Sequence, residues 1–168
     1  RLQQNEAVLL AKKRHATAAL GAKLDNASWR VYTILGDGEI EEGQVWEAAM
    51  FAAHYRLSNL LAFVDVNGLQ IDGATKDVMN SAPLTEKFAA FGWHVINIDA
   101  HSLEAIETAC EEAKTVTDRP TVILAHSVKG KGVSYMENNA GWHGKAPNDE
   151  QYAVAISELE AYLKELEG

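Results

Sequence analysis

Short, mostly apolar runs alternate with stretches of helical pattern along the chain, and this alternation limits the possible folds more than any other feature. Four such runs are rich in Val, Ile, Leu and Ala and are bounded by turn residues, which is typical of buried strands. They span residues 31–35, 60–66, 93–98 and 120–126. Strands that are apolar on both faces belong to parallel sheets covered by helices on both sides.

Helical patterns and turn-rich segments fill the intervals. The expected helices span residues 5–23, 43–57, 83–91 and 103–114, and the expected loops span residues 67–81 and 127–148. Ser102 is an N-cap residue, and a last amphipathic helix is capped by Asn148 or Asp149 and reaches Leu166. The pattern predicts one α/β domain over residues 1–168, with a parallel sheet of about five or six strands flanked by helices, and a ligand beyond the carboxyl ends of the strands.

Composition limits the classes of partner. The net charge of −9 argues against nucleic acid, because few groups could neutralise phosphates along a duplex. No apolar run approaches the roughly 18 residues that a membrane helix needs, so no membrane partner is expected. The single cysteine, Cys110, cannot form an internal disulfide and indicates a reducing compartment, with the cytoplasm as the expected location. The start at Arg1 rather than Met suggests a fragment, a processed product or a trimmed chain.

Two loops that follow strands carry groups suited to a phosphorylated, metal-bound ligand. Gly36, Asp37, Gly38 and Glu39 follow the first strand, where two glycines let the backbone approach a ligand and the aspartate supplies a hard oxygen. Asn67 follows the second strand, 30 residues after Asp37, which is the length of one strand–helix–strand unit. The two side-chain oxygens should therefore meet, although Gly-Asp-Gly and Asn-Gly are also common in plain turns.

A third loop carries lysine and histidine. Lys129 lies between Val128 and Gly130, and lysines among glycines suit phosphate oxygens, although many such runs are solvated loops. His143 is flanked by Trp142 and Gly144, which favours a position at a pocket mouth. A lone histidine is otherwise more often structural.

Together these loops resemble the thiamine diphosphate signature, Gly-Asp-Gly followed about thirty residues later by Asn. The surrounding sequence resembles the amino-terminal part of transketolase, particularly the kind encoded as two separate subunits. The resemblance covers about residues 20–162, and its most specific parts are residues 35–73, 87–102, 128–137 and 142–147.

The resemblance implies roles for individual residues. Asp37, Asn67 and the backbone carbonyl of Leu69 would bind Mg²⁺, and Gly38 would donate its amide to the diphosphate of thiamine diphosphate. Ile71 would line the wall near the thiazolium, and Lys129 would approach the diphosphate. Gly36 and Glu39 complete the predicted cofactor-binding set.

Three further roles follow from the same resemblance. His143 would contact the cofactor and the donor sugar and assist proton movement, which makes it the predicted catalytic residue. Glu42 and Glu47 match acidic residues that link paired active sites across a subunit interface. The implied reaction transfers a two-carbon ketol unit from a ketose phosphate to an aldose phosphate.

The sequence also departs from the family pattern. The family carries a glycine-rich segment and earlier histidines where residues 8–24 of this chain read as a plain helix, and its amino-terminal subunit is longer. The pyrimidine-binding domain, with its activating glutamate, is missing. We therefore expect a homo- or hetero-oligomer with a carboxyl-terminal transketolase subunit, and no catalysis by the isolated chain.

Two alternatives stay open at this point. One is another thiamine diphosphate enzyme, such as deoxyxylulose-phosphate synthase or a two-oxo-acid dehydrogenase component, which shares the Gly-Asp-Gly…Asn pattern. The other is a catalytically inactive, truncated module that binds the cofactor or supports assembly. The departures favour the second, and the intact magnesium motif opposes it.

Overall fold

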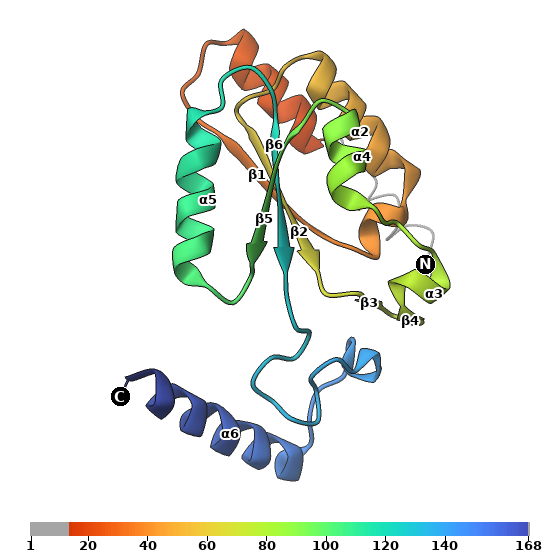
Figure 1. The fold of residues 1–168 in the computed structure, drawn as a ribbon, viewed down its shortest axis with the longest axis vertical. Coiled ribbons are helices and arrows are strands. Elements are labelled where there is room, and N and C mark those ends of the chain that lie inside the picture. Colours follow the sequence, from red (N-terminus) through yellow and green to blue (C-terminus); the bar gives the residue numbers. More distant parts are fainter. Residues whose placement is uncertain (1–13, 168) are drawn as a thin grey trace.

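Four parallel strands form the centre of the molecule, described here from a computed structural model over residues 14–167. In sheet order they are β1 (Val31–Gly36), β2 (Leu60–Val66), β6 (Thr121–His126) and β5 (His94–Asp99). All neighbouring pairs are parallel, with Val31 opposite Leu60, Leu61 opposite Thr121, and His94 opposite Thr121. All four strands therefore present their carboxyl ends at one edge of the sheet (Figure 1).

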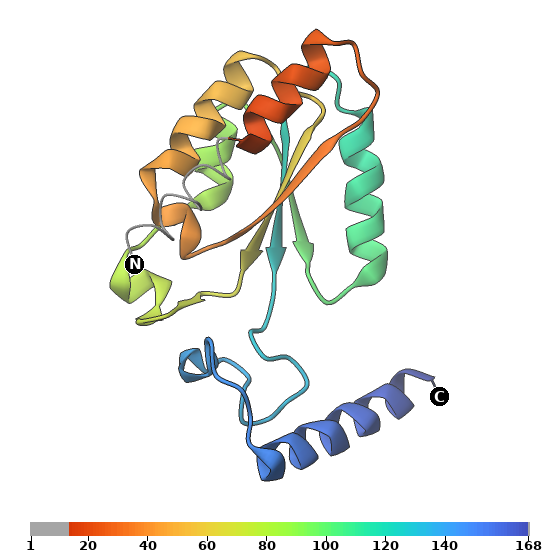
Figure 2. The same ribbon diagram turned by 180° about the vertical axis from the view of Figure 1, so that it is seen from behind.

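Helices cover both faces of the sheet (Figures 1 and 2). On one face lie the helix of residues 14–24, α2 (Gly43–His54) and α4 (Leu84–Ala90), whose side chains join one buried cluster. On the other face lies α5 (Leu103–Thr115), whose Ala109 and Ala113 pack with Leu61 and Ile123 in a second cluster. Ser102 Oγ caps α5 by accepting from Ala105 N at 3.1 Å. The α/β fold with a parallel sheet flanked by helices is confirmed.

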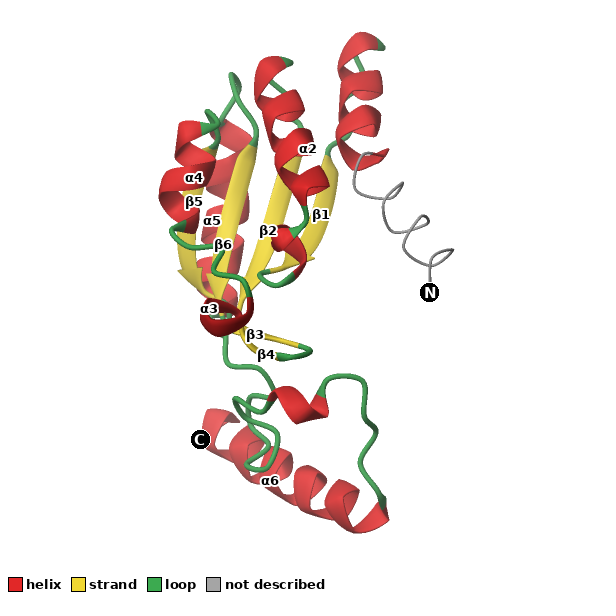
Figure 3. Ribbon diagram, turned by 90° about the vertical axis from the view of Figure 1, so that its right-hand side faces the viewer, coloured by secondary structure: helices red, strands yellow, loops and turns green. Residues whose placement is uncertain are grey.

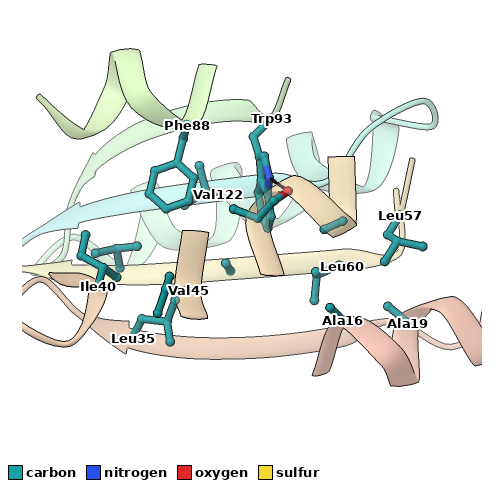
Figure 4. Packing of buried hydrophobic residues seen from close by; sticks show 14 of the residues in the cluster. Ala16, Ala19, Leu35, Ile40, Val45, Leu57, Leu60, Phe88, Trp93 and Val122 are labelled. Atoms are coloured by element: carbon teal, nitrogen blue, oxygen red, sulfur yellow. Dashed lines mark hydrogen bonds between the residues drawn. The ribbon is translucent and has the colours of Figure 1, made fainter. Parts of the chain in front are cut away.

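The larger cluster joins α2 and α4 to the sheet (Figure 4). Phe88 and Trp93 are buried with ring centroids 5.7 Å apart, and the Trp93 indole N–H donates to Ala49 O at 3.0 Å. Burying an aromatic ring of this size contributes on the order of 2–3 kcal/mol, provided that its polar atom finds a partner as it does here. This packing fixes α2 against the sheet, and the loop before α2 with it.

Two short elements follow β2 and build one wall near the sheet edge. β3 (Leu69–Gln70) and β4 (Gly73–Ala74) pair antiparallel as a separate two-stranded sheet, and α3 (Thr75–Val78) follows. Gly68 has φ of +74°, a left-handed conformation that costs glycine little, and its carbonyl accepts from Thr75 N at 3.0 Å. The segment 67–81, expected as a loop, thus contains a small hairpin.

The carboxyl-terminal part lies beyond the strand ends, apart from the helices that flank the sheet (Figures 1 and 3). It consists of the segment 127–148, which includes the 3-10 turn η2 (Ala140–Trp142), and of α6 (Asp149–Glu167). Ser134 binds Glu158 of α6 through its backbone N–H (2.7 Å) and its hydroxyl (2.6 Å). The segment that leaves β6 therefore packs on α6 rather than on the sheet.

Three expectations, about the number of strands, the end of one helix and the burial of that helix, were wrong. The parallel sheet has four strands in the described residues rather than five or six, because the hairpin pairs with itself. α2 ends at His54 rather than at residue 57, because Arg56 adopts a left-handed conformation (φ of 50°) and Leu57 N turns back to Ala52 O at 3.0 Å. The helix predicted over residues 43–57 is apolar nearly all round, which predicts that it is buried on every side with Met50 in the core; Met50 is instead 51% exposed.

The remaining elements lie close to their predicted bounds, apart from residues 5–13 of the first predicted helix, which fall outside the described residues. Within residues 14–167, each helix is too short or too polar to span a lipid bilayer.

Candidate functional site

Three chain segments meet at the carboxyl ends of β1, β2 and β6 and enclose a cleft of about 630 Å³. Parallel pairing explains the meeting, because Gly36 of β1 lies opposite Asp65 of β2, which lies opposite Ala125 of β6. The cleft is lined by Gly36, Asp37, Gly38, Glu39, Glu42, Asp65, Asn67, Leu69, Gln70, Ile71, Lys129 and His143.

Asp37 lies where the first two segments touch. It is the first residue after β1 and only 3% of its surface is exposed. Its Oδ1 accepts from Gly38 N at 2.9 Å and its Oδ2 accepts from Gly68 N at 2.6 Å. The carboxylate therefore bridges the Gly-Asp-Gly turn and the Asn67–Gly68 turn, as the 30-residue spacing predicts.

Burial raises the pKa of Asp37 above its ordinary value. The amides of Gly68 and Gly38 act in the opposite direction, and the nearby negative charge of Asp65 raises the pKa further. Burial thus makes the ionised form of Asp37 less favourable in free energy in the cofactor-free chain. A cation bound beside the carboxylate would offset this free-energy penalty.

Asn67 and Leu69 add neutral oxygens to the same place. Asn67 Oδ1 accepts from Leu69 N at 2.9 Å, and Asn67 Nδ2 donates to Asp65 Oδ2 at 2.9 Å. One carboxylate, one amide oxygen and one backbone carbonyl are hard oxygen donors, and a diphosphate supplies further oxygens to Mg²⁺. This donor chemistry fits Mg²⁺ bound together with a diphosphate.

Gly38 lets the first segment approach the β3 wall. A Cβ at this position would lie 2.8 Å from Gln70 Cβ, closer than real Cβ atoms come to their neighbours. Gln70 Nε2 in turn donates to both carboxylate oxygens of Glu41, at 2.7 and 2.9 Å. Because Gly38 has no side chain, β3 can pack closely on the first segment, and the contact between Gln70 and Glu41 fixes it there. Ile71, which follows β3 and is 70% exposed, lines the cleft.

The third segment brings Lys129 and His143 to the cleft from β6. Lys129 O accepts from Asn138 N at 2.9 Å, and Gly130 passes so close to Met136 that a Cβ would lie 2.6 Å from its carbonyl oxygen. His143 is exposed and follows η2, where Trp142 packs against Tyr135 with ring centroids 5.0 Å apart and the ring planes tilted by 54°. The segment is therefore folded on itself and carries both side chains to one place.

Every residue in the predicted cofactor-binding set lines this cleft. The two predicted interface glutamates separate: Glu42 lines the cleft, whereas Glu47 lies on α2 beside Thr17 and Phe51. Sequence reasoning missed Asp65 and Gln70. Asp65 is a charged residue inside an otherwise apolar strand, and that break in the pattern was the available signal.

Comparisons with known proteins agree with this geometry. Residues 4–160 match the family model "Transketolase, thiamine diphosphate binding domain". The chain belongs to the transketolase family. This membership confirms the resemblance, and the chain is the family's thiamine diphosphate binding domain.

Three relatives illustrate the match. The chain is 45% identical over 142 residues to the 6-deoxy-6-sulfo-D-fructose transketolase subunit SqwG of Clostridium sp. (strain MSTE9), with 84% of this chain and 52% of that protein covered. It is 40% identical over 149 residues to one of the subunits of the apulose-4-phosphate transketolase of Phocaeicola vulgatus, covering 89% and 53%. The transketolase of Campylobacter jejuni superposes with a TM-score of 0.80 at 28% identity, covering 89% of this chain and 24% of that one. The chain spans about half the length of the two relatives that are subunits.

Proposed function

We propose that this chain is the diphosphate- and magnesium-binding part of a transketolase. In the complete enzyme, a two-carbon ketol unit passes from a ketose phosphate to an aldose phosphate. Bound thiamine diphosphate supplies the carbanion chemistry of that transfer, and the protein orients and polarises the reacting groups.

The observation that carries the proposal is the position of Asp37. Its carboxylate is buried between two turns, accepts from one amide of each, and has Asn67 beside it. A plain pair of turns does not require a buried carboxylate, and burying one costs free energy unless a cation compensates. The donor set Asp37, Asn67 and Leu69 O supports Mg²⁺ as that cation.

The charge of the cleft supports metal-dependent binding. Among the described residues that line it, Asp37 and Asp65 place two carboxylates beside the proposed metal ligands, and Lys129 is the lysine there. A diphosphate entering these surroundings would be repelled without a dication between the two sets of oxygens. Metal dependence of cofactor binding is therefore a direct consequence of the proposal.

The remaining residues receive roles toward the diphosphate and the substrate. Gly38 N now donates to Asp37 Oδ1, and we expect phosphate oxygens to share this donor when Asp37 binds the metal. Lys129 would neutralise a phosphate oxygen, and Ile71 would form an apolar wall. His143, exposed at the cleft, would face the donor sugar and move a proton there.

The partner is proposed to be a second protein chain that carries the pyrimidine-binding domain. The relatives named as subunits support this, and so do exposed apolar side chains on two surfaces of the described chain. Ile34 of β1 is 77% exposed beside Tyr32, and α6 exposes Tyr162, Leu163 and Leu166. Exposed apolar patches mark interaction surfaces, and an obligate interface buries on the order of 2,000 Å² or more.

A single domain over residues 1–168 and a cytoplasmic location stay predictions.

Reconstitution tests this proposal. The purified chain is assayed for ketol transfer alone and after mixing with the pyrimidine-binding subunit of a split transketolase, and light scattering gives the mass of each sample. We expect activity only in the mixture, at the mass of a complex. Activity in a solution of monomers would contradict the proposed partner, and a complex with bound cofactor but no turnover would favour the inactive assembly module.

A further inference from the structure

Asp65 is a carboxylate in the cleft for which the magnesium motif gives no role. It is the second-last residue of β2 and is half-buried. Each of its oxygens has a partner: Oδ2 accepts from Asn67 Nδ2 at 2.9 Å, and Oδ1 accepts from the Ser127 hydroxyl. One side chain thus connects the second and third segments of the cleft.

Its first contact fixes the orientation of the Asn67 amide. The amide oxygen accepts from Leu69 N, and the amide nitrogen donates to Asp65. Rotating the amide by 180° would place its nitrogen against a backbone N–H and its oxygen against a carboxylate. Because both contacts would then join like groups, the oxygen is held on the side of Leu69.

Its second contact fixes the start of the segment that carries Lys129. Ser127 is the first residue after β6, and its N–H donates to Val66 O at 3.1 Å. Val128 N donates to His101 Nε2 at 2.8 Å from the other side. The backbone is therefore held by β2 on one side and by His101 on the other immediately before Lys129.

These contacts are made although Asp65 lies near the like charge of Asp37. We propose that Asp65 is a positioning residue that holds the Asn67 amide oxygen and the Lys129 segment ready for the metal and the diphosphate. This inference rests on the proposed function for its ligand, whereas the two hydrogen bonds can be tested without any ligand.

The first experiment compares two substitutions of Asp65. Asp65→Ala removes both acceptors, whereas Asp65→Asn can still accept from Asn67 and donate to the Ser127 oxygen. At fixed thiamine diphosphate, we expect Asp65→Ala to raise the Mg²⁺ concentration for half-saturation at least about tenfold, the effect of losing hydrogen bonds to a charged group. Asp65→Asn should stay within about threefold of wild type. Asp118→Ala, which removes an exposed carboxylate paired with Arg119, is the charge control and should bind as wild type.

The second experiment needs no cofactor. Hydrogen exchange of the Leu69 amide reports whether Asn67 Oδ1 still accepts from it, and the Val64 amide in the centre of β2 reports global stability. Asp65→Ala should speed exchange at Leu69 at least about tenfold and leave Val64 unchanged. Ser127→Ala, which keeps the Asn67 contact, should leave Leu69 protected and weaken only cofactor binding.

The outcomes separate the two levels of inference. Wild-type chain that binds no cofactor contradicts the proposed function, and the exchange data then decide the role of Asp65 alone. Unchanged exchange at Leu69 in Asp65→Ala, or unchanged Mg²⁺ dependence, overturns the positioning role. Equal losses in Asp65→Asn and Asp65→Ala overturn it as well, because Asp65 would then act through its charge. If Asp65→Ala does not fold, Ser127→Ala with wild-type cofactor affinity is the contradicting result.

Discussion

Replacing Gly38 by alanine tests how closely the first segment packs on the β3 wall. Gly38 has φ of −71° and ψ of −32°, a backbone conformation that alanine adopts freely. Without a steric conflict, the change would stabilise the fold by about 0.4–1 kcal/mol through the unfolded state. The new Cβ, however, would lie 2.8 Å from Gln70 Cβ, which is fixed to the backbone and cannot rotate away.

The balance of these two effects gives the expected magnitude. Overpacking of a close contact costs about 1–3 kcal/mol, so the net loss should be about 1–2 kcal/mol. For a chain of this length, that loss lowers Tm by about 2–8 °C. Relief requires β3 to move, which displaces Leu69 and Ile71 from the cleft, so affinity for thiamine diphosphate with Mg²⁺ should fall at least about tenfold. A displacement near 1 Å has effects of this size or larger.

Thermal unfolding and calorimetric titration measure both quantities, with matched variants. Gly43→Ala is the control, because a Cβ there meets nothing within 4 Å and glycine begins α2. It should be neutral or stabilising. Gly38→Ala should cost little stability in a Gln70→Gly background, because the Cβ that it would clash with is gone. In a Gln70→Ala background, which keeps this Cβ, Gly38→Ala should cost as much as in the wild type. A Gly38→Ala chain with unchanged Tm and affinity would refute the reasoning.

Three further predictions follow from the site. Asp37→Ala should abolish Mg²⁺-dependent cofactor binding while Asn67→Ala only weakens it, because Asp37 supplies charge and Asn67 a neutral oxygen; calorimetric titration with equal affinities would contradict the assignment. His143→Ala in the reconstituted enzyme should leave cofactor affinity within a few-fold and lower turnover by about 10²–10⁴-fold, the usual cost of lost proton handling; collapsed binding with unchanged turnover would make His143 an anchor. The raised pKa of Asp37 sets a pH dependence: its protonated form stabilises the cofactor-free fold below the ordinary value of 3.8, and this contribution is lost as the pH rises through the raised pKa. Mg²⁺ binds the ionised form of Asp37. The gain in Tm from Mg²⁺ with thiamine diphosphate should therefore shrink as the pH falls through that raised pKa. A gain in Tm that stays constant down to pH 3.8 would contradict the prediction.

The elements that follow hydrophobic burial were predictable from the sequence. β2 has the predicted bounds because its run is apolar on both faces, and Ser102 caps α5 because its hydroxyl satisfies a free amide at the helix start. The hairpin of β3 and β4 was not predicted, since two-residue strands leave no periodic pattern. The apolar pattern also did not predict which side of α2 is exposed, because Met50 is apolar yet lies on the outer face of the helix.

The cleft shows the same division. The spacing of Asp37 and Asn67 is fixed by one strand–helix–strand unit, so the contact of Asp37 with the Asn67–Gly68 turn followed from parallel pairing. The contacts of Asp65 and Gln70 depend on side chains from segments 62 and 29 residues away, and no local pattern records such partners. Sequence motifs thus pointed to the proposed ligand oxygens, whereas only the structure shows which groups contact these residues.

Calorimetric titration of the chain with thiamine diphosphate tests the central claim most directly. The titration is run with Mg²⁺, with a chelator in its place, and with thiamine, which lacks the diphosphate. The carboxylates of Asp37 and Asp65 and the donor set around Asp37 predict binding of thiamine diphosphate only when Mg²⁺ is present, and no binding of thiamine. Binding of equal strength in the chelator, or of thiamine as tightly as its diphosphate, would contradict the claim that this chain holds the diphosphate end through magnesium.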